Sequence, residues 1–344
     1  MPLHKAIVAA LIAATALPAQ SLLVLSKQDH TLAIIDPTTL QVIAKAPVGN
    51  DPHEVIASSD GTTAYVSNYG FGAFNTLAVI DLTAKKPLPE IDLGPLHGPH
   101  GLTFAGGKLW FTVEANKAVG RYDPATKKVD WVLGTGQNRT HMIDVSADLQ
   151  HIVTSNVSSG TVSLIDQEEL HIQPPPPPRP GEPQRQGPGG PPPNMPHKDW
   201  SETVVKVGNG SEGFDLSPDR KQIWVANAQD ATISIIDVAT KAVIATLHPN
   251  VEGANRLKFT PDGTKVLVST HDGIAILDAN TRKEVKRLPI GGAAGILVQP
   301  DGTRAFIACG QANYVAVIDL HTFTLSGKIN AGGEPDGMAW ASHP

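Results

Sequence analysis

The chain has 344 residues, with 27 Lys and Arg against 33 Asp and Glu and a formal net charge of -6. This charge argues against a basic nucleic-acid-binding surface, and the 41% content of hydrophobic residues excludes an intrinsically disordered chain. With 32 Gly, 29 Pro and only 17% charged residues, the composition favours many short strands and turns over long helices. Because Cys309 is the only cysteine, no intramolecular disulfide is possible.

The first nineteen residues have the three-part plan of a secretory signal. A short start that contains Lys5 precedes an apolar run from Ala6 to Leu17, and the small residue Ala19 follows. We therefore predict a signal peptide over residues 1–19 and a periplasmic or secreted protein. The apolar run is too short to span a bilayer and no cysteine follows it for lipid attachment, so we expect neither a transmembrane segment nor a lipid anchor.

A short segment that ends in aspartate recurs along the rest of the chain. Its aspartates are Asp36, Asp81, Asp123, Asp166, Asp237, Asp278 and Asp319. Successive positions differ by 41 to 45 residues, except for one interval of 71 residues from 166 to 237. We interpret these aspartates as turn caps, whose carboxylates accept hydrogen bonds from the main chain, and not as catalytic residues.

The long interval contains a stretch rich in proline and glycine. It includes Pro174–Pro178 and the segment from Gly187 to Pro193. Such a sequence cannot pair as a strand, and we predict a disordered, solvated insert over residues 171–199 that serves as a linker or as a docking segment for a partner. Because it interrupts the hairpin between the third and fourth strands of a repeat, we expect it on the face opposite the histidines described below.

Each repeat contains four short strands, expected in the first complete repeat at residues 53–58, 63–68, 76–81 and 88–93. Four strands in every forty-odd residues, repeated seven times, predict an all-β fold, a seven-bladed β-propeller over residues 20–344. Residues 21–25 match a second strand and residues 336–340 match a first strand. We therefore expect the two ends of the chain to share one blade and to close the ring.

The segments Tyr65–Asn68 and Trp224–Asn227, together with the recurring Asp-Gly hairpins, resemble the YVTN-type β-propeller repeat. The resemblance covers the chain after residue 19 apart from the insert, and it implies a propeller of the kind found in cell-surface and periplasmic proteins. Lactonase-like seven-bladed propellers are more distant relatives. His53, which follows Pro52, is similar to the Pro-His start of lactonase-type blades, but no complete catalytic set is carried over.

The first strand of every propeller blade lines the central channel, and its opening residue lies at the channel mouth. Aligning the repeats places one column of residues there: His53, His100, His141, Glu212, Asn255, Ala294 and Asp336. Three histidines from consecutive blades predict a site for zinc, copper or iron, because calcium and magnesium prefer oxygen ligands. The alternative is structural: each imidazole hydrogen-bonds a neighbouring loop and no ion is bound.

Other polar residues at this mouth are candidate ligand contacts, namely Glu212, Asn255, Arg256 and Asp336. Three flanking charges are candidates to orient the histidines: Glu54, Arg139 and Glu334. The sequence contains no nucleophile elbow, no phosphate-binding loop and no Cys-x-x-Cys-His haem-attachment motif.

Two classes of function remain open. The first is a secreted or periplasmic, monomeric propeller that binds a metal ion, a small molecule or a protein partner at its channel mouth without turnover. The second is a metal-dependent hydrolase or lyase, in which the three histidines hold the ion and Glu212 or Asp336 is the fourth ligand or the general base. In that enzyme Arg256 steadies a substrate carboxylate, and the resemblance makes a lactone the first substrate class to test.

Overall fold

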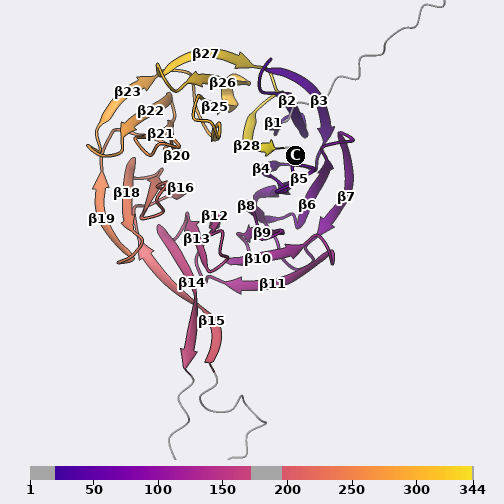
Figure 1. The fold of residues 1–344 in the computed structure, drawn as a ribbon, viewed down its shortest axis with the longest axis vertical. Coiled ribbons are helices and arrows are strands. Elements are labelled where there is room, and N and C mark those ends of the chain that lie inside the picture. The colour runs from indigo at the N-terminus through magenta and orange to yellow at the C-terminus, as the bar shows by residue number, and fades with distance from the viewer. Residues whose placement is uncertain (1–19, 172–195, 343–344) are drawn as a thin grey trace, which may run out of the picture.

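Seven four-stranded antiparallel sheets form a ring in the computed structural model, which describes residues 20–171 and 196–342 (Figure 1). The predicted all-β, seven-bladed β-propeller is therefore confirmed. Within the described ranges the helices are two single 3₁₀ turns, η1 (Gly70–Gly72) and η2 (Gly310–Ala312). None of the described helices is long and apolar enough to cross a membrane.

The blades are numbered along the chain, and their strands run from the channel outwards in the order given. Blade 1 contains β28 (Pro335–Ser342), β1 (Gln20–Ser26), β2 (Thr31–Asp36) and β3 (Gln41–Pro47). Blade 2 contains β4 (Pro52–Ala57), β5 (Thr63–Asn68), β6 (Thr76–Asp81) and β7 (Lys86–Asp92). Blade 3 contains β8 (Pro99–Ala105), β9 (Lys108–Val113), β10 (Ala118–Asp123) and β11 (Lys128–Gly134).

The remaining four blades follow the same order. Blade 4 contains β12 (Thr140–Val145), β13 (His151–Asn156), β14 (Thr161–His171) and β15 (Pro196–Lys206). Blade 5 contains β16 (Ser211–Leu216), β17 (Gln222–Asn227), β18 (Thr232–Asp237) and β19 (Ala242–Leu247). Blade 6 contains β20 (Leu257–Phe259), β21 (Lys265–Thr270), β22 (Gly273–Asp278) and β23 (Glu284–Leu288), and blade 7 contains β24 (Ile296–Val298), β25 (Arg304–Cys309), β26 (Tyr314–Asp319) and β27 (Thr324–Ile329).

The hydrophobic core lies between neighbouring blades. The second and third strands are buried on both faces, because successive side chains of a strand point to opposite sides and each side meets another blade. One core cluster, for example, joins Leu23 and Ile34 of blade 1 to Val66 and Ile80 of blade 2. The outermost strands, such as β3, instead alternate between exposed and partly buried residues.

Blade 1 closes the ring. Its inner strand β28 comes from the C-terminal end of the chain and pairs antiparallel with β1, with Leu22 opposite Trp340. This pairing is the shared blade that the sequence predicts, and it covers the edge of β1 that would otherwise be open.

The recurring aspartates cap the turns between third and fourth strands, as expected. Six of them accept a main-chain N–H from two or three residues further on: Asp36, Asp81, Asp123, Asp237, Asp278 and Asp319. Asp166 differs, because β14 continues past it without a turn. Its carboxylate instead pairs with Nδ1 of His151 and Nζ of Lys241, each at 2.7 Å.

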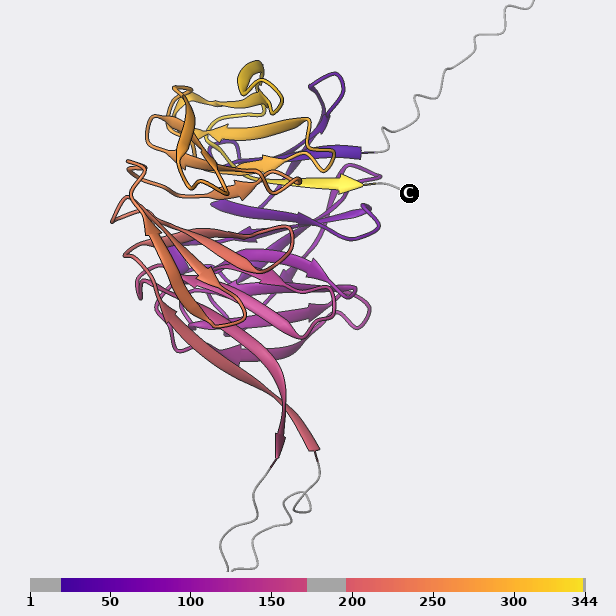
Figure 2. The ribbon, with the colours of Figure 1, turned by 60° about the vertical axis from the view of Figure 1, so that its left-hand side comes forward.

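The strands β14 and β15 are longer than the others and extend beyond the disc (Figure 2). Their pairing continues to His171 opposite Pro196, so residues 171 and 196–199 belong to strands and not to the expected insert. The proline run begins only at Pro174, and the preceding residues are free to pair. Residues 172–195 of the expected insert and the predicted signal peptide, residues 1–19, lie outside the described residues. Because successive strands are antiparallel, the end of this hairpin lies on the face opposite the start of β12, as predicted.

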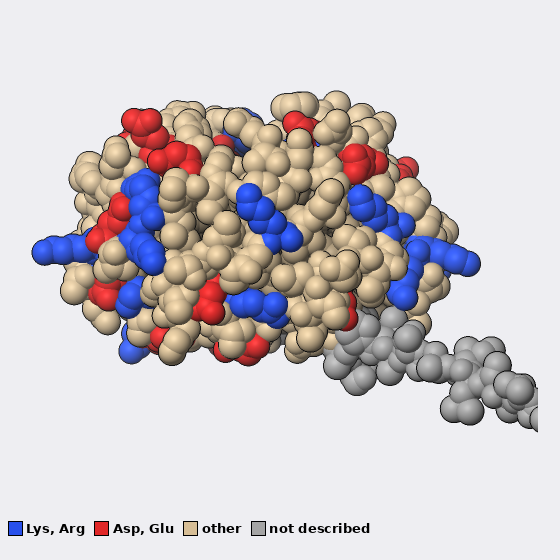
Figure 3. Space-filling model, turned by 90° about the horizontal axis from the view of Figure 1, so that it is seen from above, with Lys and Arg blue, Asp and Glu red and all other residues tan. Residues whose placement is uncertain are grey.

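Charged side chains are mixed over the surface seen edge-on in Figure 3. Lysine and arginine lie among aspartate and glutamate on this side, and no large basic patch forms there.

Candidate metal-binding site at the channel mouth

All seven residues of the predicted column line one cavity of about 1190 Å³, at the end of the channel where the inner strands begin. The cavity therefore brings together every residue that the sequence analysis proposed as metal ligand or ligand contact. Arg139 and Glu334, two of the flanking charges, line it as well.

Local strand irregularity turns the column residues towards this cavity. The pairing of the inner with the second strand shifts between Pro52 and Val55, between Pro99 and Leu102, and between Thr140 and Ile143. Each of these shifts is a β-bulge that contains one of the three histidines, and Glu212 lies in the corresponding bulge of β16. Because a bulge re-aims the side chain that it contains, it explains how these residues face the mouth while the rest of the strand faces the core.

His100 and His141 are drawn together by close packing of their two strands. A Cβ atom on Gly101 would lie 2.3 Å from the carbonyl oxygen of His141, so only glycine permits this approach. Thr112 of β9 bridges the same two strands, since its Oγ1 accepts the N–H of Gly101 at 2.9 Å and donates to the His141 carbonyl at 2.6 Å. The centroids of the two imidazole rings are consequently only 3.8 Å apart.

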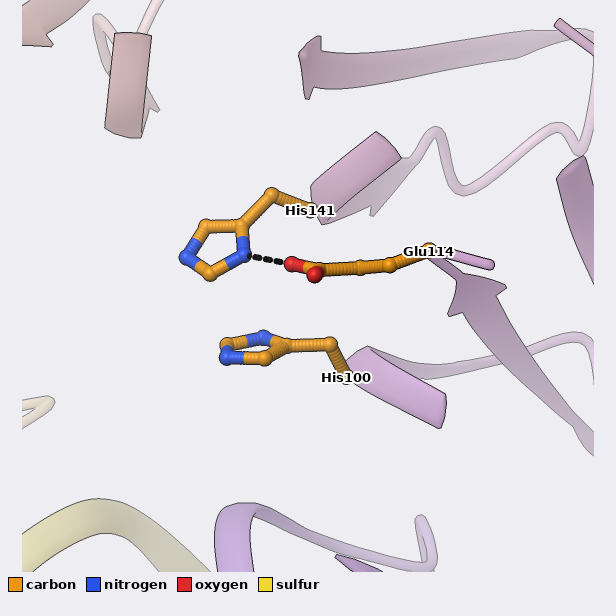
Figure 4. Close-up of side chains that lie close together, drawn as sticks. All are labelled: His100, Glu114 and His141. Atoms are coloured by element: carbon orange, nitrogen blue, oxygen red, sulfur yellow. Dashed lines mark hydrogen bonds and ion pairs between the residues drawn. The ribbon is translucent and has the colours of Figure 1, made fainter. Parts of the chain in front are cut away.

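Glu114 completes a buried group with these two histidines (Figure 4). Its Oε1 lies 2.5 Å from Nδ1 of His141, and one candidate ligand atom from each of the three residues lies within 4.8 Å of the others. Both histidines are 2% exposed, and both keep a buried ring nitrogen without a hydrogen bond: Nδ1 of His100 and Nε2 of His141. Buried polar atoms are nearly always paired, so these two nitrogens mark a place suited to a further ligand or ion.

Glu212 approaches the free nitrogen of His141. Its Oε2 lies 2.9 Å from Nε2, but without the alignment of a hydrogen bond. In a neutral His141 ring, Nδ1–H donates to Glu114 and Nε2 faces the carboxylate of Glu212 with its lone pair. The lone pair and the carboxylate repel each other unless a positive charge lies between them. A proton on Nε2 can supply that charge, and so can a metal ion shared by both atoms.

Burial and neighbouring charges shift the pKa values of His100, His141 and Glu212 in different directions. Burial and the neighbouring His141 hold the pKa of His100 well below its usual range, so its ring is neutral. Burial also works against a charge on His141, but its contacts with the carboxylates of Glu114 and Glu212 raise its pKa. Although burial disfavours the ionised form of Glu212, His141 and the nearby arginines lower the pKa of this carboxyl to about 2.

His53, the third predicted metal ligand, has other partners. Its Nε2 lies 2.9 Å from Nζ of Lys27 and 3.1 Å from Oδ1 of Asp51, and its Nδ1 lies 3.7 Å from Oδ2 of Asp336. Its ring is 5.0 Å from that of His100. Because an ammonium group beside this imidazole repels a second cation, the geometry favours Glu114 or Glu212 over His53 as the companion of His100 and His141.

The predicted ligand contacts differ in how far their side chains are already paired within the protein. Arg256 is 12% exposed, and its guanidinium is already paired within the protein. Nη2 lies 2.6 Å from Oε1 of Glu54, and Nη1 lies 2.8 Å from Oδ1 of Asn255. Asp336 pairs with Lys27 at 3.2 Å. Arg139 is 41% exposed, and its Nε and Nη1 lie 3.3 Å from Glu114 and 3.8 Å from Glu212.

The sequence analysis missed Glu114, Tyr69 and Lys27. Glu114 and Tyr69 occupy the same position in consecutive blades, directly after β9 and β5, and the Tyr69 hydroxyl donates to Oε2 of Glu114 at 2.5 Å. An alignment of the residues that follow the second strands places Tyr69 and Glu114 in one column, and this signal is present in the sequence.

Comparisons with known proteins extend the fold assignment. The family described as the cytochrome D1 heme domain matches residues 190–303, which is less than half of the chain and contains none of the three histidines. No curated protein matches the sequence. Among solved structures, a functionally unknown protein from Desulfotomaculum acetoxidans DSM 771 is 14% identical with a TM-score of 0.70, covering 94% of this chain and 99% of its own.

Two further solved structures are proposed 6-phosphogluconolactonases. The protein from Bacteroides uniformis ATCC 8492 is 14% identical, with a TM-score of 0.69 over 93% of this chain and 99% of its own. The protein from Bacteroides fragilis NCTC 9343 is 15% identical, with a TM-score of 0.70 over 93% of this chain and 97% of its own. At this identity the likeness shows the fold, a seven-bladed propeller with lactonase-like neighbours.

Proposed function

We propose that this protein is a secreted or periplasmic YVTN-type propeller that binds one transition-metal ion at His100 and His141 and holds a small molecule at its channel mouth. The observation that carries the proposal is the pair of buried nitrogens without an aligned hydrogen bond, Nδ1 of His100 and Nε2 of His141, beside a cavity of about 1190 Å³. The second of them faces the carboxylate of Glu212 at 2.9 Å. A binding role for the mouth follows from the convergence of polar side chains on this cavity.

The donor set suits zinc, copper or iron. Two imidazoles and a carboxylate are ligands that these ions accept, with bonds of about 2.0–2.2 Å. Two ligand atoms on one such ion lie roughly 3 Å apart, which matches the 2.9 Å between Nε2 of His141 and Oε2 of Glu212. Glu114 then accepts the hydrogen bond from Nδ1 of His141, the ring nitrogen that does not face the ion. Carboxylates commonly orient metal-binding histidines in this way.

The charges at the mouth also support a bound cation. Four carboxylates line the cavity, those of Asp51, Glu212, Glu334 and Asp336. Three fixed cations face them, those of Lys27, Arg139 and Arg256. Glu114, just behind His141, adds a further negative charge. A divalent ion would offset this excess in a place where burial makes unpaired charge costly.

Elemental analysis of the mature protein, purified without chelators or a histidine tag, tests the proposal. We expect near-stoichiometric zinc, copper or iron in the wild type and none in the double variant His100→Ala, His141→Ala. The variant His30→Ala is the matched control, because His30 lines the same cavity but is exposed. A wild type that takes up no ion even from excess zinc would contradict the proposal, and NMR should then show a doubly protonated His141 between Glu114 and Glu212.

A metal-dependent hydrolase or lyase is the second candidate function. The observation in its favour is the ionised Glu212 beside Nε2 of His141, with the part-exposed Arg139 next to Glu212. A bound ion would polarise a substrate carbonyl as a Lewis acid. The lactonase-like neighbours make lactones, including 6-phosphogluconolactone, the first substrates to assay. Hydrolysis that follows metal occupancy would favour this function, whereas ligand binding without turnover would favour the first.

A further inference from the structure

An aromatic loop overhangs one side of the cavity. The residues between β5 and β6 include η1 and carry Phe71, which is 88% exposed, and Phe74, which is 37% exposed. Both side chains line the same cavity as His100 and Arg139. Two phenylalanines exposed next to each other at the rim of a polar cavity offer an apolar surface to a ligand.

The loop is held firmly in this position. Gly72 N–H donates to the Tyr69 carbonyl at 3.1 Å, and the Phe74 carbonyl accepts the N–H of Gly98 from the next blade at 2.7 Å. Phe71 adopts a left-handed backbone conformation with φ of 52°, which is unfavourable for a bulky residue. The corresponding turn of blade 7, η2, carries the polar Gln311 instead, so the aromatic side of the mouth is specific to blade 2.

A continuous series of rings leads from this loop to the proposed metal site. The centroids of Phe71 and Tyr69 are 6.0 Å apart, those of Tyr69 and His100 are 5.2 Å apart, and those of His100 and His141 are 3.8 Å apart. The first two separations are typical of interacting aromatic rings, and the two imidazoles lie closer still. A flat apolar group placed on Phe71 therefore lies on the same side of the mouth as the two histidines.

One cation of the cavity, Arg139, lies close to Tyr69 in this series of rings. Arg139 is the most exposed of the three cations of the cavity, with 41% of its side chain exposed against 26% for Lys27 and 12% for Arg256. Its Nη1 has only a contact of 3.8 Å, to Glu212. Its guanidinium can therefore donate to a carboxylate of a ligand while it keeps its contacts with Glu114 and Glu212.

We propose that the mouth selects an aromatic carboxylate, with the ring on Phe71 and Phe74 and the carboxylate directed to Arg139 and the metal site. The direction of the carboxylate rests on the proposed function, whereas the contact of the ring with Phe71 does not. The ligand is thus a small planar acid, and saturated or neutral analogues of the same size bind more weakly.

Isothermal titration with three probes of similar size tests this selectivity: phenylacetate, cyclohexylacetate and phenylacetamide. We expect zinc-loaded wild type to prefer phenylacetate over both others, and Phe71→Ala to bind it about tenfold more weakly while losing the preference over cyclohexylacetate. Leu325→Ala is the matched control, because Leu325 is an exposed apolar residue of the outer strand β27. The zinc content of each variant is measured separately.

The outcomes separate this inference from the proposed function. Equal binding of the ring and its saturated analogue, or a preference that survives Phe71→Ala, would overturn the inference even if zinc is bound. Each titration is repeated without zinc, so an absent metal refutes the proposed function while the ring preference is still measured. If no probe binds and wild type dimerises in sedimentation while Phe71→Ala does not, Phe71 contacts a second copy of the chain and the inference is wrong.

Discussion

Replacing Thr112 with valine should loosen the candidate site without altering either histidine. Thr112 is fully buried, and its hydroxyl accepts the N–H of Gly101 and donates to the carbonyl of His141. Valine has nearly the same shape but no hydroxyl, so both main-chain groups lose their partner. An unpaired buried group costs about 1–3 kcal/mol, and we expect the free energy of unfolding to fall by roughly 2–4 kcal/mol.

Denaturant unfolding of wild type, Thr112→Val and Thr112→Ser measures this effect. Serine keeps the hydroxyl and loses one methyl group, which should cost about 1 kcal/mol. If the proposed function is right, zinc affinity should also fall about tenfold in Thr112→Val and change little in Thr112→Ser. Equal destabilisation by the two substitutions would show that the hydroxyl does not bridge the strands, and the reasoning on the paired histidines would then be refuted.

Three further predictions follow from the fold. Removing β28 by truncation before Pro335 should abolish cooperative thermal unfolding, since β1 would lose its inner partner; an unchanged Tm would refute the closure. Gly101→Ala should destabilise the protein by about 1–3 kcal/mol and lower zinc uptake, whereas Gly134→Ala, where a Cβ has open space, should do neither. The pKa of Asp278 is lowered to about 2 by the main-chain N–H of Thr281 and by Lys265, so its contribution to stability is present above about pH 4 and lost as the pH falls towards 2. The stability difference between wild type and Asp278→Asn should shrink over that interval, and a gap that stays constant would contradict the assigned pKa.

The architecture could be predicted because it depends on short sequence patterns that recur at a regular spacing. Recurring aspartates cap six of the seven outer turns, and the apolar second and third strands return with the same spacing. A repeat of this kind has one way to bury both faces of every sheet, which is to pack each blade between two others. The ring closure followed from the same logic, since two incomplete ends can complete one blade.

The same alignment predicted that His53, His100 and His141 would meet, since the opening residues of all inner strands must line one channel. The assignment of partners could not be predicted in this way. Which nitrogen is free depends on side chains from second strands and loops, such as Glu114 beside His141 and Lys27 beside His53. Those contacts join residues 27 and 26 positions apart, and no periodic pattern records them.

The sequence by itself therefore determined the fold, the closure of the ring and the residues that surround its mouth, because these depend on patterns repeated in every blade. Only the tertiary structure decided that His100 and His141 form the close pair, that Arg256 is committed to Glu54 and that Phe71 stands exposed at the rim. These features are particular to single blades. They depend on how far neighbouring strands approach, as at Gly101, and distances of that kind are set by packing across the channel.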